Sequence, residues 1–346
     1  MKISGIRTIG VVQVLVFLGI ALGITNIGCE PQSEDPILFT SDGKGAERGK
    51  EIYSYSLKDG SEYNLSQSSG LSEYGPSISP DGNRVAFISS GAERHLLEFM
   101  LLNGSERQKL HVFESGQNID QIMYTWSPDS KRIAFVDQTG SLFVVNVQSS
   151  ETELATEPAQ ITDLYAHDVG GWSRDGNWVV FSVADEGFEG IYKRNPDGVN
   201  EFRLTETPDT KPLWSPDSKR IAFLSTRDGN EEIYIMREDG SDQRRLTSND
   251  ATESHLAWSP DGKYLMFVSN RDGNTEIYLV EISGGKQIRL THNAGNDYSP
   301  VWSPDGNSIV FVSEFDGDAE LVIMDRSGDN QRQITKNEHA DFDPDW

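Results

Sequence analysis

The sequence predicts an all-β protein folded as a seven-bladed β-propeller, and three observations lead to this fold class. A turn motif, Ser-Pro-Asp-Gly or a close variant, recurs six times, and a tryptophan precedes five of the six copies. Successive copies are 48, 46, 42, 44 and 44 residues apart. Each interval holds four short strand-like segments without helical periodicity. The copies begin at Ser79, Ser127, Ser173, Ser215, Ser259 and Ser303.

The unit at residues 258–291 shows why each segment becomes a strand or a turn. Its Ser-Pro-Asp-Gly segment ends an inner strand, because proline presets φ, Ser and Asp bond the neighbouring backbone, and glycine accepts a left-handed conformation. An Asp-Gly-Asn hairpin separates the next two apolar runs. The three strands expected after the first turn are Tyr264–Val268, Glu276–Val280 and Gln287–Thr291.

The two ends of the repeat region complete each other. Residues 341–346 match residues 297–302, which begin an inner strand, and no turn or second strand follows them. At the other end, Ile37–Thr40, Glu51–Tyr55 and Tyr63–Ser66 resemble strands two, three and four of a blade. We expect strand 341–346 to join these N-terminal strands and close a seven-bladed ring over residues 37–346. A six-bladed ring is the alternative if the N-terminal segment is peripheral.

The first 28 residues differ from the rest and predict a signal peptide. Lys2 and Arg7 precede an apolar run at Ile9–Ile24, and the only cysteine, Cys29, stands five positions after this run. This pattern resembles a bacterial lipobox, from which Asn26 departs. We expect Cys29 to be lipidated and residues 29–36 to form a tether. The alternatives are an uncleaved membrane anchor and an ordinary cleaved signal, and all three export the rest of the chain.

Composition restricts the function classes. The formal net charge is -25, which repels phosphate backbones, so we expect no nucleic-acid partner. A single cysteine excludes a disulfide framework and a cysteine-rich metal site. The expected partners are envelope or cell-surface proteins, and the membrane through the lipid on Cys29. We expect the propeller itself to be a monomer.

The repeat resembles the WD-like repeat of TolB-type propellers. The pattern Trp-Ser-Pro-Asp-Gly, followed by Phe-x-Ser-x-Arg-Asp-Gly-Asn-x-Glu-Ile-Tyr, is clearest at residues 258–278, and the resemblance covers residues 37–346. It implies an envelope protein whose propeller binds other proteins. TolB itself carries an α/β domain before its propeller, for which we expect no room here. By analogy with lipoprotein sorting, Glu30 after Cys29 indicates the outer membrane of a Gram-negative cell, with the propeller in the periplasm or at the cell surface.

The repeat also suggests a candidate binding ring on the face that carries the blade-to-blade connections. One residue of each unit stands five positions before the repeat tryptophan, or before Ile78, and five of the seven are acidic. We expect these residues near the mouth of the central channel, where they would bind a divalent cation or a cationic side chain. The competing interpretation is that each one caps the loop before its strand. The ring residues are Glu73, Gln121, His167, Asp209, Glu253, Asp297 and Asp341.

These observations predict a non-catalytic binding or scaffold protein that uses the acidic loop face. No catalytic residue is assigned, and no cofactor is expected, although a divalent cation such as calcium stays open for the ring. The alternative is a glycan-binding protein or a propeller enzyme of the polysaccharide-lyase kind, with its site at the channel mouth. A peptidase of the prolyl-oligopeptidase kind would need a Gly-x-Ser-x-Gly elbow, which the sequence lacks. The histidines fall in different units without paired spacing, so we expect no histidine metal centre.

Overall fold

The computed structural model describes residues 35–43, 49–68, 70–92, 94–113, 122–137, 139–147 and 158–346. The chain divides into two compact units, residues 1–30 and 31–346, and every described residue belongs to the second. The predicted signal peptide, Cys29 and most of the tether therefore lie outside the described residues. No segment of the described ranges forms a helix that could cross a membrane.

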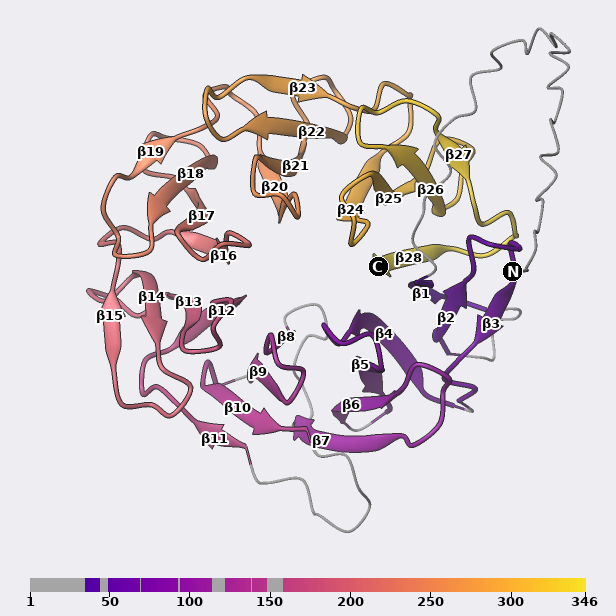
Figure 1. The fold of residues 1–346 in the computed structure, drawn as a ribbon, viewed down its shortest axis with the longest axis horizontal. Coiled ribbons are helices and arrows are strands. Elements are labelled where there is room, and N and C mark those ends of the chain that lie inside the picture. The colour runs from indigo at the N-terminus through magenta and orange to yellow at the C-terminus, as the bar shows by residue number, and fades with distance from the viewer. Residues whose placement is uncertain are drawn as a thin grey trace, which may run out of the picture. The chain divides into compact units, whose positions relative to one another are not determined.

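Within the described residues, the strands form seven four-stranded antiparallel sheets arranged in a ring (Figure 1). Six blades each run from an inner to an outer strand in chain order. The first blade contains β4 (Ser72–Ile78), β5 (Arg84–Ser90), β6 (His95–Leu101) and β7 (Gln108–Phe113). The second contains β8 (Met123–Trp126), β9 (Arg132–Val136), β10 (Leu142–Asn146) and β11 (Ala159–Gln160). The third contains β12 (Ala166–Trp172), β13 (Val179–Val183), β14 (Gly190–Arg194) and β15 (Glu201–Arg203).

The last three complete blades repeat the same order. The fourth contains β16 (Thr210–Trp214), β17 (Arg220–Ser225), β18 (Glu232–Arg237) and β19 (Arg244–Arg245). The fifth contains β20 (Glu253–Trp258), β21 (Tyr264–Ser269), β22 (Glu276–Glu281) and β23 (Gln287–Arg289). The sixth contains β24 (Asp297–Trp302), β25 (Ser308–Ser313), β26 (Glu320–Asp325) and β27 (Arg332–Gln333).

The seventh blade combines both ends of the propeller. Its inner strand is β28 (Asp341–Asp345), followed by β1 (Ile37–Ser41), β2 (Glu51–Tyr55) and β3 (Glu62–Asn64). Strand β28 pairs antiparallel with β1, with Asp341 opposite Ser41 and Asp345 opposite Leu38. The predicted seven-bladed ring and its closure are thus confirmed, and the six-bladed alternative is wrong. Pairing β1 in this way covers a strand edge that would otherwise be free to associate.

One fully buried phenylalanine from the second strand of every blade forms the repeated core between the sheets. Phe39 in β1 takes this position in the seventh blade, so the composite blade packs like the others. Most of these rings stack on an aromatic ring of the third strand, as Phe267 does on Tyr278 with centroids 5.5 Å apart. The seven phenylalanines are Phe39, Phe87, Phe135, Phe181, Phe223, Phe267 and Phe311.

The Ser-Pro-Asp-Gly turns are built as the sequence predicts. Ser303 Oγ donates to Asp305 Oδ1 at 2.6 Å and accepts the backbone N–H of Ser308 at 2.9 Å. The same Ser–Asp hydrogen bond recurs in all six copies.

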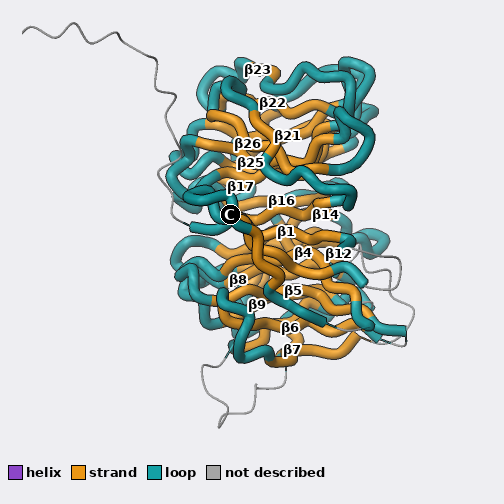
Figure 2. Tube along the Cα trace, turned by 90° about the vertical axis from the view of Figure 1, so that its right-hand side faces the viewer, coloured by secondary structure: helices purple, strands orange, loops and turns teal. Residues whose placement is uncertain are grey.

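Figure 2 shows the propeller from the side, with loops along both faces and strands between them. We call the face with these turns the turn face, and the face with the second-to-third-strand hairpins and the blade-to-blade connections the loop face.

Candidate functional site

The structure places five predicted ring residues where the chain enters an inner strand, and it buries all five. The carboxylate residues Glu73, Asp209, Glu253, Asp297 and Asp341 are 0 to 1% exposed. Gln121 lies outside the described residues. The five positions are equivalent in the repeat, because each residue lies at or directly beside the first pair between the first and second strands of its blade.

Each buried carboxylate is bonded to nearby groups of its own blade or of the connection before it. Glu253 accepts hydrogen bonds from Asn249 and from Arg271, both at 2.7 Å. Asp297 accepts from Asn293 at 2.7 Å and from Ser313 at 2.5 Å. Burial raises the pKa of Asp297 against these hydrogen bonds. These contacts are those of a residue that caps the loop before its strand.

The carboxylates therefore do not converge on a shared ligand. In the part of the chain that the structure describes, no group of three or more His, Cys, Asp or Glu side chains is arranged to hold a metal ion. The contacts favour the capping interpretation, and a binding role for the ring stays a prediction.

In the third blade, Asp168 takes the position that the sequence assigned to His167. Asp168 pairs with Ser182 as Asp297 pairs with Ser313, and Asp168 is buried while His167 is exposed. The reason is that this blade has one residue fewer between Trp172 and Ser182 than the other blades have between the equivalent residues. Counting five residues back from Trp172 therefore gives His167, one residue before the capping position. The adjacent Phe181-Ser182 is the sequence signal that shows the deletion, because the other blades have Phe-x-Ser or, in the second blade, Phe-x-Asp.

The carboxylate of Asp168 accepts contacts from two basic side chains, Lys211 and His167. Lys211 Nζ lies 2.6 Å from Asp168 Oδ1, and His167 Nδ1 lies 3.0 Å from Oδ2. Burial opposes ionisation of Asp168, but the hydrogen bond from His167 and the charge of Lys211 hold the pKa of Asp168 well below its usual range. The same hydrogen bond raises the pKa of His167. Asp168 is therefore ionised and paired at neutral pH.

Two residues beyond the capping position, the inner strands of five blades share an unusual backbone conformation. Gly75, Lys211, His255, Ser299 and Asp343 have φ of 56°, 50°, 51°, 49° and 51°, respectively. The pairing with the second strand shifts register at these residues. A non-glycine residue in this left-handed region carries strain of about 1–2 kcal/mol. Four blades thus hold a strained side chain at one equivalent position.

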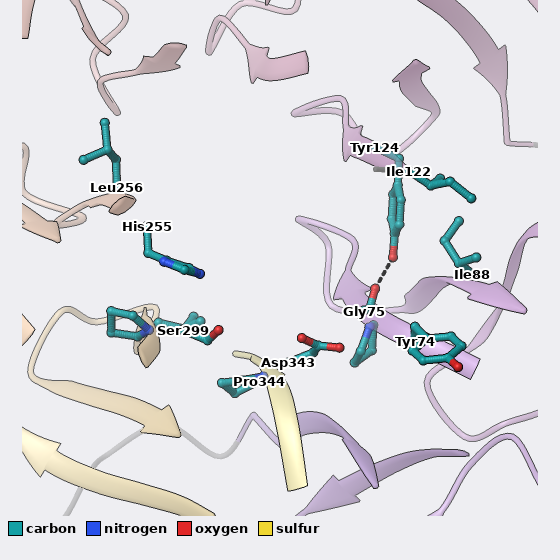
Figure 3. A pocket seen from close by; sticks show the side chains of 13 residues that line it. Tyr74, Gly75, Ile88, Ile122, Tyr124, His255, Leu256, Ser299, Asp343 and Pro344 are labelled. Carbon is teal, nitrogen blue, oxygen red and sulfur yellow. Dashed lines mark hydrogen bonds between the residues drawn. The ribbon is translucent and has the colours of Figure 1, made fainter. Parts of the chain in front are cut away.

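Four of these five residues line a cavity of about 620 Å³ in the central channel. Figure 3 shows His255 and Ser299 on one side of it, Tyr74 and Tyr124 on the other, and Asp343 between them. Apolar side chains and prolines complete the wall. They are Pro76, Ile88, Ile122, Leu256, Pro300, Val301 and Pro344. An apolar wall with a few polar groups, at this volume, is typical of a ligand-binding pocket.

The polar groups of the cavity differ in their hydrogen bonding and in their pKa. The Tyr124 hydroxyl donates to the backbone oxygens of Gly75 and Ala86, and burial raises its pKa well above the usual value. His255 is accessible from the channel, yet its depth between the blades lowers its pKa, and the charge of Lys211 lowers it further. At neutral pH the cavity therefore offers a neutral imidazole beside the hydroxyl of Ser299 and the carboxyl group of Asp343.

The cavity residues were not predicted from the sequence, because the predicted ring rests on what the units share. His255 lies within β20, two residues after the capping Glu253. The signal that could have found the cavity is the break in the repeat: two residues after the capping position stand Gly75, Lys211, His255, Ser299 and Asp343.

Comparison with known proteins identifies the family. A family model described as the TolB beta propeller domain matches residues 116–269 and 252–346, about two thirds of the chain. No protein of curated function matches the sequence. Among solved structures, a putative TolB from Agrobacterium tumefaciens is 25% identical, with 71% of this chain and 90% of that chain covered and a TM-score of 0.54.

Two further structures share the fold at lower identity. TolB from Acinetobacter baumannii is 20% identical, with 90% and 82% of the two chains covered and a TM-score of 0.56. The β-propeller domain of the Trilobed protease from Pyrococcus furiosus, described as having an open velcro topology, is 17% identical, with 88% and 93% covered and a TM-score of 0.67. Because the family model spans most of the propeller, this chain belongs to the TolB β-propeller family.

Proposed function

We propose that this protein is a non-catalytic, exported binding protein of the cell envelope. Its propeller engages envelope or cell-surface proteins through the acidic loop face and the channel cavity behind it. A lipid on Cys29 would hold it at the membrane, which is the outer membrane in a Gram-negative cell. The TolB-type propeller and the apolar leader before Cys29 support this proposal. A Cys29→Ser variant should then leave the membrane fraction, and retention of that variant would contradict the anchor.

The observation that carries the proposal is that four blades place four different side chains at one equivalent position whose backbone is strained. Glycine adopts φ near 50° freely, as Gly75 does in the first blade. Lys211, His255 and Ser299 instead keep a side chain there, and so does Asp343. The repeat does not explain these side chains, because it would supply the same residue in every blade. Strain at a cavity wall is typical of functional positions, and an asymmetric wall suits one partner segment bound in one orientation.

The test is affinity capture from solubilised envelopes with the full chain and with a channel variant. The channel variant carries His255→Gly, Ser299→Gly and Asp343→Gly, which remove side chains from the cavity wall but suit the left-handed backbone. A control variant carries Lys58→Gln and Lys286→Gln, two exposed residues of the turn face. We expect one protein to be captured by wild type and control, and lost by the channel variant at an unchanged or higher melting temperature.

Retention of that protein by the channel variant would contradict the assignment of the cavity. Capture of nothing by any of the three proteins would contradict the binding-protein proposal.

The second candidate is a glycan-binding protein or propeller enzyme, and the size of the cavity favours it. About 620 Å³ with two tyrosines at the wall accommodates a small ligand. Binding of soluble oligosaccharides to wild type but not to the channel variant, measured by calorimetry, would support this candidate. If calorimetry detects no heat of binding with the wild type, this second candidate is wrong.

A further inference from the structure

We propose that the loop face of the third blade docks a basic protein segment on two exposed aromatic rings. The surface consists of Tyr165 and Phe188 with an acidic rim, and we call it the aromatic patch. This inference rests on the proposed role as a binding protein but uses a surface outside the channel cavity. The rim residues are Asp163, Asp185, Glu186 and Glu189.

Both rings are more exposed than aromatic side chains usually are. Tyr165 is 46% exposed and Phe188 is 56% exposed. Tyr165 belongs to the connection that enters the third blade, and Phe188 belongs to the hairpin between β13 and β14. Large exposed aromatic residues that lie in neighbouring segments are typical of the central contacts of protein interfaces.

Hydrogen bonds from the backbone N–H groups hold the two segments together. The N–H of Tyr165 donates to Asp185 Oδ2 at 2.8 Å, and the N–H of Ala184 donates to the carbonyl oxygen of Tyr165 at 3.3 Å. The N–H of Phe188 donates to the carbonyl oxygen of Asp185 at 2.9 Å. The two rings therefore extend from a single bonded structure.

The rings are also supported from below. A Cβ added at Gly140 would lie 2.4 Å from Tyr165 Cδ2, so the tyrosine ring packs directly against that glycine. The carbonyl oxygen of Phe188 accepts a hydrogen bond at 2.8 Å from the hydroxyl of Tyr192, a buried residue. Because these contacts order the two rings before a partner binds, binding costs less conformational entropy.

The charge of the patch specifies the chemistry of its partner. The fourth and fifth blades carry Arg227 and Arg271 in this hairpin, where each pairs with a buried capping carboxylate. The third blade carries Asp185 at the same position, and Phe188 where those blades carry asparagine. The patch thus has an acidic residue in place of a cation.

The guanidinium of Arg203, which contacts the same hairpin, is already engaged. Arg203 donates through Nε to the carbonyl oxygen of Thr205 and through Nη2 to that of Glu189. A partner segment with Lys or Arg on either side of an apolar side chain would complement the acidic rim and the rings together.

The test places a photo-crosslinking residue in the full chain inside living cells. Phe188→p-benzoylphenylalanine is compared with the same replacement at Val199, which is 75% exposed on the turn face of the same blade. We expect an adduct at position 188 and none at position 199, with the linked peptide of the partner rich in Lys and Arg. Adding Asp163→Lys and Glu186→Lys should lower the adduct yield about tenfold, because rim charges mainly set the association rate.

The outcomes separate this inference from the proposed function. Absence of an adduct at position 188, while capture by the channel cavity persists, would overturn the aromatic patch alone. Loss of both would overturn the proposed function as well. An adduct with a second copy of this chain, with its own N-terminal segment or with an acidic peptide would also overturn the inference.

Discussion

Lys211, His255, Ser299 and Asp343 share one backbone position, with φ between 49° and 51°, although their side chains have nothing in common. The capping carboxylates two residues earlier are alike in chemistry and in burial. Repetition of a side chain in this propeller accompanies a packing role, as the seven buried phenylalanines also show. The side chains vary, by contrast, at the strained and accessible position two residues after the capping carboxylate, and this is the position that contributes to the cavity.

At the residue scale, Ser299→Gly should not destabilise the protein. Relief of left-handed strain, about 1–2 kcal/mol, exceeds the entropy that glycine adds to the unfolded chain, about 0.4–1 kcal/mol. We expect the free energy of unfolding to stay equal or rise by up to about 1.5 kcal/mol in urea titrations. The matched control, Ser254→Gly in β20, has no positive φ to relieve and should lose about 0.5–1 kcal/mol. Equal losses in the two variants would contradict the strain argument.

At the scale of elements, β28 does more than complete a sheet. It pairs with β1 on one side, and Asp345 Oδ2 accepts the backbone N–H of Ile78 in β4 at 2.6 Å on the other. One strand thus connects the seventh blade to the first. Asp345 keeps some solvent access, but it lies deep among the inner strands, and this burial raises its pKa to about 6.

This raised pKa makes stability depend on pH in a defined direction. The folded state binds the Asp345 proton more tightly than the unfolded state, whose pKa is near 3.8. The stabilisation from Asp345 is therefore complete below about pH 4 and is lost as pH rises through about 6. Asp345→Asn, which stays neutral, should be about 2 kcal/mol more stable relative to wild type at pH 7.5 than at pH 4.

The measurement is the free energy of unfolding of both proteins across this pH range. Taking the difference between the two proteins cancels the titration of other carboxylates, such as Asp297 and Asp341, which both retain. A difference that is constant from pH 4 to pH 7.5 would contradict the assigned protonation of Asp345.

At the scale of the whole molecule, the ring is held by seven similar interfaces, and one of them depends on the last strand. Trp346 is buried with Phe39 and Tyr55 between the sixth and seventh blades. Its Nε1–H donates to the carbonyl oxygen of Asp35 at 3.2 Å, beside β1. Removing this side chain should weaken the one blade whose strands come from both ends of the propeller.

Trp346→Ala should therefore cost about 3–5 kcal/mol of stability. The control is Trp178→Ala, a partly buried tryptophan outside the repeat position, for which we expect a smaller loss. Thermal unfolding followed by circular dichroism measures both. Weakened pairing of β28 also frees the edge of β1, so Trp346→Ala should associate at high concentration in light scattering. Equal losses and an unchanged size distribution would mean that β28 does not hold the ring closed.

Much of the fold could be predicted because its determinants are local. The Ser-Pro-Asp-Gly turns, the hairpins and the strand segments each depend on neighbouring residues, and their period implies the blade. The partial units at residues 37–66 and 341–346 predicted the composite blade, since each supplies the strands that the other lacks. The family followed from the same repeat.

The candidate site was less predictable, because burial and proximity depend on the packed ring. The acidic residue at the start of an inner strand could face the channel or the blade, and only packing against Arg271, Asn249 and their equivalents decided for the blade. The register of the third blade depended on a one-residue deletion in β13, which moved the capping role from His167 to Asp168.

The sequence by itself determined the strands, the turns and the number of blades, because these follow from local chemistry repeated at a constant period. Only the tertiary structure decided which side chains meet. Closing the ring brings Gly75 to the same cavity as His255, Ser299 and Asp343, although up to 268 residues separate them along the chain. No local pattern encodes that meeting, since it arises from the accumulated rotation of seven packed blades.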